Sequence, residues 1–236
     1  MALFGDGITF EPLTGDDLDD IVGLAADTWY FAGGENALSN GGAAGSWLDD
    51  SERERIACLM ATDEIATYFA DMTWGVKAVL KGKTVGVIVT HGMHVSAEAA
   101  ERYGRIGAEA RQHAEELLTA ARERSEHAGS EEPEKPAYQE ELQVTEEMCE
   151  KIGLTGQPRV LLLVVSNEAR GKGLGKRLLG QARDHFRRHN AKSFWLVTDT
   201  DCDWPFYEHL GLERLAERKS TVAGAPESYY IYGGEA

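Results

Sequence analysis

The residues best suited to chemistry lie in one short stretch, residues 166–177, with the sequence SNEARGKGLGKR. The apolar run 159–165 precedes it and helical spacing follows it, so a buried strand leads through a glycine-rich turn into a helix. Such a turn directs backbone N–H groups and the positive end of the helix toward one place. Four basic residues crowd this turn, although the formal net charge of the chain is −16: Arg170, Lys172, Lys176 and Arg177. The stretch therefore predicts a binding site for a phosphate group.

Two common nucleotide-binding motifs do not fit this turn. The dinucleotide motif GxGxxG requires glycine at position 176 or 178, where the chain has Lys176 and Leu178. The P-loop motif GxxxxGKS/T requires glycine at 170 and Ser or Thr at 177, where the chain has Arg170 and Arg177. A plain helix-entry turn without a ligand is the remaining alternative, and the concentration of basic residues argues against it.

Residues 170–175, RGKGLG, resemble the Arg/Gln-x-x-Gly-x-Gly/Ala signature of the GNAT superfamily of acyl-CoA-dependent N-acetyltransferases. A second segment, FYEHLGL at 206–212, is similar to the family's FYxxxGF segment, and TDTDCD at 198–203 leads into it. The proline that usually ends the preceding strand is replaced here by Asn167. The resemblance is strong over 158–233 and weak over about 5–94.

The resemblance implies acetyl-CoA as the co-substrate, held in a V between two splayed strands, residues 159–166 and 193–198. Main-chain groups of the first strand would bind the pantetheine amides, because splayed strands leave backbone groups unpaired. The amides of the glycine turn would bind the pyrophosphate. The residues expected to bind acetyl-CoA are therefore Leu163, Val165, Arg170, Gly171, Lys172, Gly173, Leu174, Gly175 and Lys176.

Tyr207 matches the position of the family's frequent general acid. A phenol with a pKa near ~10 faces a departing thiolate near ~8.5, so full proton transfer is uphill by roughly 2 kcal/mol. Tyr207 is therefore expected to stabilise the thiolate by hydrogen bonding as much as to protonate it. A tyrosine that only packs in the core is the alternative.

The general base is not fixed by these motifs. The strand 159–166 contains no carboxylate, which leaves Asp199, Asp201, His91 and His94 as candidates. We predict Asp201 and keep the other three open. Cys202 stands between two acids that raise the pKa of a thiol, which favours direct transfer in a ternary complex over an acetyl-enzyme. The scattered histidines and cysteines show no ligand spacing, so no metal is expected.

The elements that must position these residues predict an α/β chain with the GNAT fold. Its mixed central sheet is expected to be splayed between strands 4 and 5 and flanked by helices. We interpret residues 1–236 as a single acetyltransferase domain. The predicted strands are 8–12, 74–80, 84–90, 159–166, 193–198, 213–222 and 228–232, and the predicted helices of the body begin near 14, 51, 174 and 203.

Residues 95–157 fall outside the resemblance and are predicted to form a helical hairpin inserted between strands 3 and 4. The first helix, capped by Ser96, carries a heptad-like seam of Ala99, Tyr103, Ile106, Ala110, His113, Leu117 and Ala120. The second, 137–152, offers Tyr138, Leu142, Met148 and Ile152. The seam is expected to pair with this helix, while the part near Tyr103 and Ile106 could contact the body, a substrate or a second copy of the chain in a homodimer.

Composition limits the function. The 236 residues are 42% hydrophobic and carry 40 acidic against 24 basic side chains, which fits a globular chain and argues against a nucleic-acid partner. No apolar run approaches the ~20 residues of a membrane span, and no secretory signal is recognisable. The three scattered cysteines favour a reduced, cytoplasmic location.

The sequence as a whole predicts an N-acetyltransferase that transfers an acetyl group from acetyl-CoA to a primary amine of a small molecule or peptide. The alternative is a non-catalytic acyl-CoA-binding module of GNAT type that acts through a protein partner. Both need the glycine turn, and only the enzyme needs Tyr207 and a base. The loops 31–50 and 220–227 are expected to select the acceptor, and the inserted hairpin 95–157 could contribute.

Overall fold

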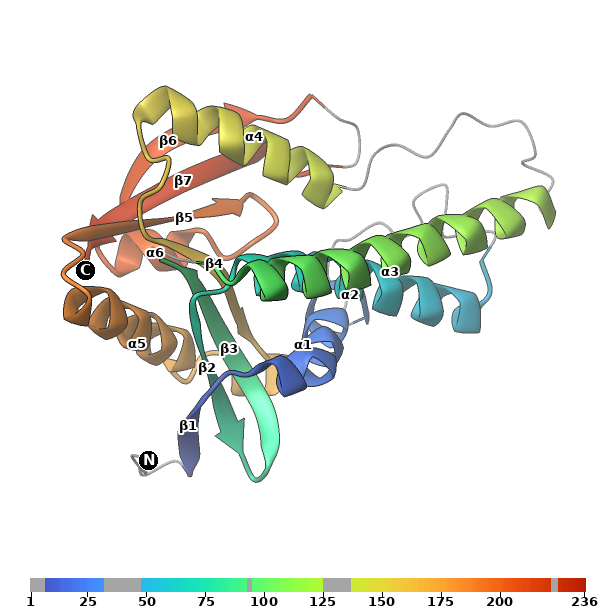
Figure 1. The fold of residues 1–236 in the computed structure, drawn as a ribbon, viewed down its shortest axis with the longest axis horizontal. Coiled ribbons are helices and arrows are strands. Elements are labelled where there is room, and N and C mark those ends of the chain that lie inside the picture. Colours follow the sequence, from blue (N-terminus) through green and yellow to red (C-terminus); the bar gives the residue numbers. More distant parts are fainter. Residues whose placement is uncertain (1–6, 32–47, 93–94, 125–136, 222–224) are drawn as a thin grey trace.

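A seven-stranded sheet forms the centre of the computed structural model, which describes residues 7–31, 48–92, 95–124, 137–221 and 225–236. The strands follow the order β1-β2-β3-β4-β5-β7-β6, and every neighbouring pair is antiparallel except β4 and β5 (Figure 1). Their bounds are β1 Ile8–Pro12, β2 Trp74–Leu80, β3 Lys83–His91, β4 Arg159–Val165, β5 Ser193–Asp199, β6 Glu213–Lys219 and β7 Ser228–Glu235. The mixed α/β sheet of the GNAT fold is thereby confirmed.

The parallel strands β4 and β5 separate soon after they begin. Only Arg159 and Val160 of β4 pair with β5, opposite Trp195 and Leu196. The pairing of β4 with β3 is irregular at the same level, since Thr90 lies opposite Val160 and Val89 opposite Leu162. Leu161 is thus an extra residue, a β-bulge that bends β4 away from its parallel neighbour. The predicted splay between strands 4 and 5 is confirmed.

Helices cover both faces of this sheet. On one face lie α1 (Leu18–Ala25) and α2 (Asp50–Asp71), whose apolar side chains pack with those of β3 and β4. On the other face lies α5 (Leu174–Arg188), with Leu174, Leu178 and Phe186 buried against the sheet. The short helix α6 (Pro205–His209) follows β5 and belongs to this second side. None of the described helices is long and apolar enough to span a membrane.

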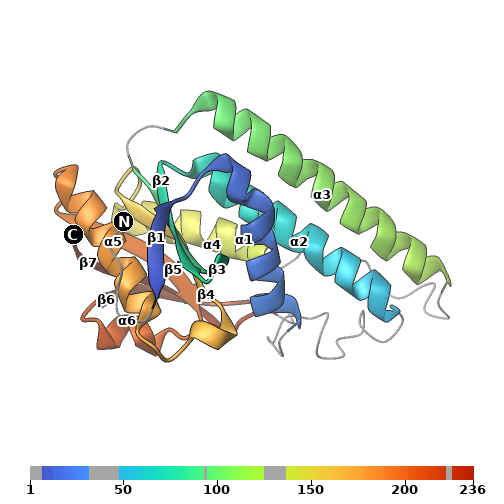
Figure 2. The ribbon, with the colours of Figure 1, turned by 90° about the horizontal axis from the view of Figure 1, so that it is seen from below.

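The insertion between β3 and β4 is helical, as predicted, and consists of α3 (Ala97–Arg124) and α4 (Ala137–Ile152). The expected pairing of its two helices is wrong. α3 lies along α2 on the outside of the domain, whereas α4 packs on β6 and β7 (Figures 1 and 2). The seam of α3 therefore follows the alternative expectation of contact with the body, and the Tyr103 ring meets the Phe69 ring edge-on at 5.4 Å.

Small residues bring α3 close to α2. A Cβ at Gly107 would lie 3.0 Å from the Asp63 carboxylate, and Ala110 and Ala121 are buried in the same contact. Ala120, which was expected in the seam, is exposed, because the contact continues through Ala121 instead. Ser96 caps the helix as predicted, since its Oγ accepts a 3.3 Å hydrogen bond from the Ala99 amide.

The buried face of α4 also differs from the expectation. Leu142 and Ile152 are 44% and 37% exposed, while Val144, Met148 and Cys149 are buried against β5 and β7. Glu140 fixes this orientation, because its carboxylate accepts hydrogen bonds from the hydroxyls of Ser220 and Tyr229. The described residues do not include His94, the side chain of Tyr138, most of the loop 31–50 or part of the loop 220–227.

Candidate active site

The glycine turn joins β4 to α5 through backbone conformations that favour glycine. A turn of 3-10 helix, Asn167–Ala169, is followed by Gly171 and Gly173, both with φ of +72°. The first hydrogen bond within α5 runs from the Arg177 amide to the Gly173 carbonyl at 3.2 Å. The three preceding amides of the helix have no acceptor within it and point out at its positive end. The turn is therefore built to receive an anion.

The two motif segments touch each other. A Cβ at Gly175 would lie 3.1 Å from Cζ of Phe206, so the start of α5 packs directly against α6. The neighbouring residue Tyr207 is half-buried, with its ring 5.2 Å from that of Phe206 and 5.7 Å from that of Tyr232. The fold thus places the predicted general acid beside the predicted phosphate-binding turn.

The basic residues of the turn have different surroundings. Arg170 is exposed and its Nε donates a 3.3 Å hydrogen bond to the Val165 carbonyl, while Nζ of exposed Lys172 bonds the Glu168 carbonyl at 2.8 Å. Arg177 is placed differently, because its guanidinium lies 5.0 Å from the ring centre of Phe10 in β1. Arg170 and Lys172 therefore supply positive charge at the turn.

The edge of β4 that faces the split carries backbone groups of Leu163 and Val165. The Ser166 amide donates to the Val85 carbonyl at 2.9 Å, which fixes the side on which β3 is bound. Because backbone groups alternate along a strand, those of Leu163 and Val165 point the other way, into the gap between β4 and β5. Both side chains pack against the core under α5.

Burial raises the pKa of the Tyr207 hydroxyl, and nearby Cys202, Asp199 and Asp203 raise it further. The phenol therefore stays protonated at neutral pH and can donate a hydrogen bond. Burial and the carboxylates of Asp199 and Glu141 likewise raise the pKa of the Cys202 thiol. A protonated thiol is a poor nucleophile.

The sequence candidates for the base that the structure describes lie in two places. Asp201 is exposed, and its amide donates to Oδ1 of Asp199 at 2.8 Å. Asp199 is half-buried, and burial raises its pKa despite this bond and another from the Cys202 amide. Nδ1 of His91 lies 3.1 Å from the Asp71 carbonyl, at the end of β3. These positions bring Asp199 and Asp201 together and leave His91 apart.

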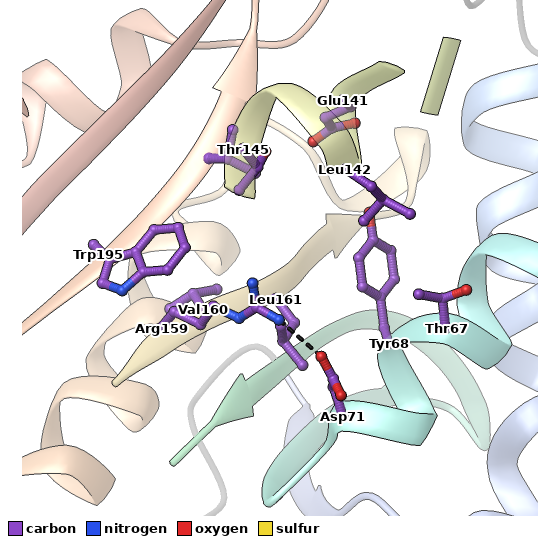
Figure 3. Close-up of a pocket in the computed structure, with 11 residues that line it drawn as sticks. Thr67, Tyr68, Asp71, Glu141, Leu142, Thr145, Arg159, Val160, Leu161 and Trp195 are labelled. Carbon is purple, nitrogen blue, oxygen red and sulfur yellow. Dashed lines mark hydrogen bonds and ion pairs between the residues drawn. The ribbon is translucent and has the colours of Figure 1, made fainter. Parts of the chain in front are cut away.

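A cleft opens on the face of the sheet opposite α5, between α2 and α4, and we call it the α2–α4 cleft (Figure 3). Its floor is the place where β4 and β5 separate, and its cavity volume is about 40 Å³ within about 430 Å³ of space that includes the open solvent at its mouth. The lining residues are Thr67, Tyr68 and Asp71 of α2, Glu141, Leu142 and Thr145 of α4, Arg159, Val160 and Leu161 of β4, and Trp195 and Val197 of β5.

The cleft contains an unusual carboxylate. Burial raises the pKa of Glu141 to about 8, with Asp199 and Glu64 contributing through their negative charges. The Tyr68 hydroxyl donates a hydrogen bond to Oε1 of Glu64 at 3.2 Å. Burial raises the pKa of Tyr68 as well. Nη2 of Arg159, the cation of the cleft lining, is bound to Asp71 at 2.8 Å.

Sequence reasoning missed Glu141 as a functional candidate. It lies in a charged helix outside both motifs, and nothing in the sequence shows that this helix returns to the sheet. A signal was nevertheless present, because Glu141 precedes Thr145 by four residues and Met148 by seven. This spacing places a carboxylate on the buried face of an amphipathic helix.

Comparison with known families identifies the family of the chain. The family model described as the acetyltransferase (GNAT) domain matches residues 109–226, half of the chain. The chain therefore belongs to the GNAT acetyltransferase family. No protein of curated function matches it in sequence.

Solved structures resemble the fold. The apo form of a single-residue mutant of agmatine N-acetyltransferase is 12% identical, with a TM-score of 0.52, covering 98% of this chain and 100% of that one. The protein smu.2055 of Streptococcus mutans UA159 is 13% identical, with a TM-score of 0.50, covering 96% of this chain and 98% of that one. At these identities the likeness concerns the fold alone.

Proposed function

We propose that the chain is an N-acetyltransferase that moves the acetyl group of acetyl-CoA directly to a primary amine of a small molecule or peptide. The observation that carries the proposal is the alignment of the open edge of β4 with the glycine turn at its end. An extended pantetheine arm can pair with such an edge, and a pyrophosphate can bind the helix amides beyond it.

The residues of this edge and turn fit acetyl-CoA. No described atom lies within 4 Å of a Cβ built at Gly173, so a phosphate can approach the backbone there. Arg170 and Lys172 add charge on the exposed side. The proposed binding residues remain Leu163, Val165, Arg170, Gly171, Lys172, Gly173, Leu174, Gly175 and Lys176.

Acetyl-CoA supplies an activated thioester, and the protein has to orient it and manage protons. Tyr207 is the proposed general acid, because its raised pKa keeps a donor available to the leaving sulfur. Asp201 is the base predicted from the sequence, and its exposure would let it act through water. No group of three or more His, Cys, Asp or Glu that could hold a metal occurs among the described residues.

The proposal treats residues 1–236 as one domain that includes the insertion 95–157. Support comes from α3 and α4, which both bury side chains against the body. The three cysteines are free, which supports a cytoplasmic location where thiols stay reduced.

The test is a thiol-release assay with acetyl-CoA over a panel of amines, polyamines, amino acids and peptides. The panel includes agmatine, which the solved structure of similar fold carries in its name. Calorimetry measures acetyl-CoA binding separately. Binding together with thiol release supports the enzyme, whereas binding without release for every amine favours the non-catalytic module. Absence of binding would contradict both.

A further inference from the structure

We propose that Glu141, contributed by the inserted helix α4, is the general base of the transfer in place of Asp201, and the group that binds the acceptor's ammonium. The acceptor is accordingly an alkyl amine that carries no carboxylate of its own. This inference rests on the proposed acetyltransferase function and concerns the α2–α4 cleft.

The α2–α4 cleft lies beside the start of the gap between β4 and β5. Its floor includes Val160, the last residue of β4 paired with β5, and Leu161 of the bulge. The gap between the strands begins at this level, and the glycine turn lies at the other end of β4. An acyl carrier that enters the gap along β4 would therefore present its far end to the cleft, where an acceptor can approach from the opposite face.

Glu141 has no partner within the described structure. Within the described part of the chain, its carboxylate has neither a hydrogen bond nor an ion pair, although it lies beside the acids Glu64 and Asp199. A half-buried, uncompensated carboxylate is costly, and such groups are normally paired. The guanidinium of Arg159 does not pair with Glu141. Its Nη2 is bound to Asp71, its Nε is buried without a hydrogen-bond partner in the described structure, and it lies 5.5 Å from the ring centre of Trp195. A cationic ligand would supply the missing partner.

Two neutral polar groups that line the same cleft also lack hydrogen-bond partners. The Thr145 hydroxyl and the Trp195 indole N–H are buried without a hydrogen-bond partner in the described structure, and these residues are only 6% and 4% exposed. Thr145 stands one helical turn after Glu141 on α4. Unsatisfied buried donors and acceptors are uncommon in native proteins, and they are found where a ligand binds. The apolar side chains of Leu142 and Val197 also line the cleft, where they would contact the alkyl chain of an acceptor.

The chemistry then balances. The Glu141 carboxylate accepts one proton from the acceptor ammonium, which frees the nitrogen lone pair to form the C–N bond at the thioester carbonyl. The C–S bond breaks with its electron pair on sulfur, and Tyr207 donates a proton to that sulfur. The second N–H proton leaves to solvent as the amide forms, and the phenolate recovers a proton from solvent. Glu141 then releases the proton it accepted to solvent, which restores the carboxylate for the next turnover.

The charges around Glu141 suit this role. The titratable groups that surround it are Glu64, Tyr68 and Asp71 on α2, Arg159 on β4, Asp199 on β5, Cys202 after β5 and Tyr229 on β7. Acids outnumber the single paired cation, so a carboxylate-bearing acceptor would be repelled. The raised pKa also brings the proton affinity of Glu141 closer to that of an alkyl ammonium, ~10.4 for a lysine side chain.

The experiment compares Glu141→Gln with Glu146→Gln, which removes the same charge from an exposed position of α4, and with Asp201→Asn. Acetyl-CoA affinity by calorimetry should be unchanged in all three. With 1,4-diaminobutane as acceptor at pH 9, above the pKa of about 8 so that Glu141 is ionised, kcat/KM should fall ~10²–10⁴-fold in the Glu141 variant and stay near wild type in the Glu146 variant. The wild type should prefer n-butylamine to 4-aminobutyrate by at least about tenfold, and E141Q should narrow that preference because it removes a repulsive charge.

Two measurements separate this inference from the proposed function. Calorimetry of 1,4-diaminobutane with the protein–CoA complex should show about tenfold weaker binding in E141Q, whether or not turnover occurs. Thermal unfolding without substrates provides the second readout. Wild-type stability should fall as pH rises from about 4.5 to about 8, while the Gln variant escapes this loss. Wild-type turnover and diamine affinity in E141Q, or a larger loss in D201N, would overturn the role of Glu141. Failure of acetyl-CoA binding would instead remove the proposed function.

Discussion

Nε of Arg170 donates a hydrogen bond to the Val165 carbonyl at 3.3 Å, so the glycine turn holds the end of the open edge of β4. The same carbonyl belongs to the set of groups proposed to bind the pantetheine arm. Arg170 thus has two roles in the proposal, one as a charge for the pyrophosphate and one as a support for the strand end.

We expect Arg170→Ala to weaken acetyl-CoA binding by about three- to tenfold, because one exposed charge contributes little in water. Gly173→Val should weaken it much more. A branched side chain would stand where the phosphate approaches, and the left-handed backbone at φ +72° disfavours it as well. Calorimetry measures both affinities.

Gly180→Val is the control, because Gly180 lies in α5, the helix that begins directly after Gly173, and a Cβ there meets no atom within 4 Å. Circular dichroism would establish that each variant is folded. Unchanged acetyl-CoA affinity in folded Gly173→Val would mean that the phosphate site lies elsewhere.

Tyr207→Phe should lower turnover by ~10²–10⁴-fold and leave acetyl-CoA affinity nearly intact, since only the hydroxyl is removed. Because the pKa of Tyr207 is raised above its usual value of 10.0, its titration should not limit kcat below that pH. Steady-state kinetics from pH 6 to 9.5 would check both expectations. Tyr103→Phe, a buried tyrosine of α3, serves as control, and full turnover in the Tyr207 variant would exclude it from the mechanism.

Much of the sheet could be predicted from the sequence because its signals are local. The strand 8–12 and the helix 137–152 have the predicted bounds, and the split between strands 4 and 5 was expected from the resemblance. Alternation, glycine turns and helix caps report on neighbouring residues, so they survive without knowledge of the fold.

The docking of the inserted helices α3 and α4 could not be predicted from the sequence. The seam of α3 correctly predicted an apolar face near Tyr103. An apolar face alone does not reveal which element packs against it. The contact with α2 depends on Gly107 and on the buried acid Asp63, neither of which has an apolar pattern. Glu141 was missed for the same reason, because its role depends on where α4 docks.

The ion pair between Arg111 and Asp63 should stabilise the contact of α3 with α2. Asp63 is 2% exposed and receives two 2.8 Å hydrogen bonds from the guanidinium. Arg111→Met leaves this carboxylate buried and unpaired, which should lower the free energy of unfolding by roughly 2–3 kcal/mol. That is below the ~3–5 kcal/mol for fully buried pairs, because the guanidinium is partly exposed. Urea denaturation would measure it, with Arg105→Met, an exposed residue of the same helix, as control. Equal losses in both variants would contradict a specific role for the pair.

The last prediction concerns removal of the insertion. Joining residue 94 to residue 157 through a short Gly-Ser turn would still let β3 and β4 pair. It would also expose the α2 face covered by α3 and the residues Trp195, Tyr229 and Ile231 covered by α4. We expect this variant to be insoluble or to lose cooperative unfolding, since both helices bury core side chains.

A protease site introduced within 125–136 is the comparison. Because α3 and α4 pack on different parts of the body and not on each other, the cut chain should keep its circular dichroism and its thermal transition. A trimmed protein that folds, keeps the same mass in solution and acetylates the same amines would show that the insertion is dispensable, and would also remove Glu141 from the reaction.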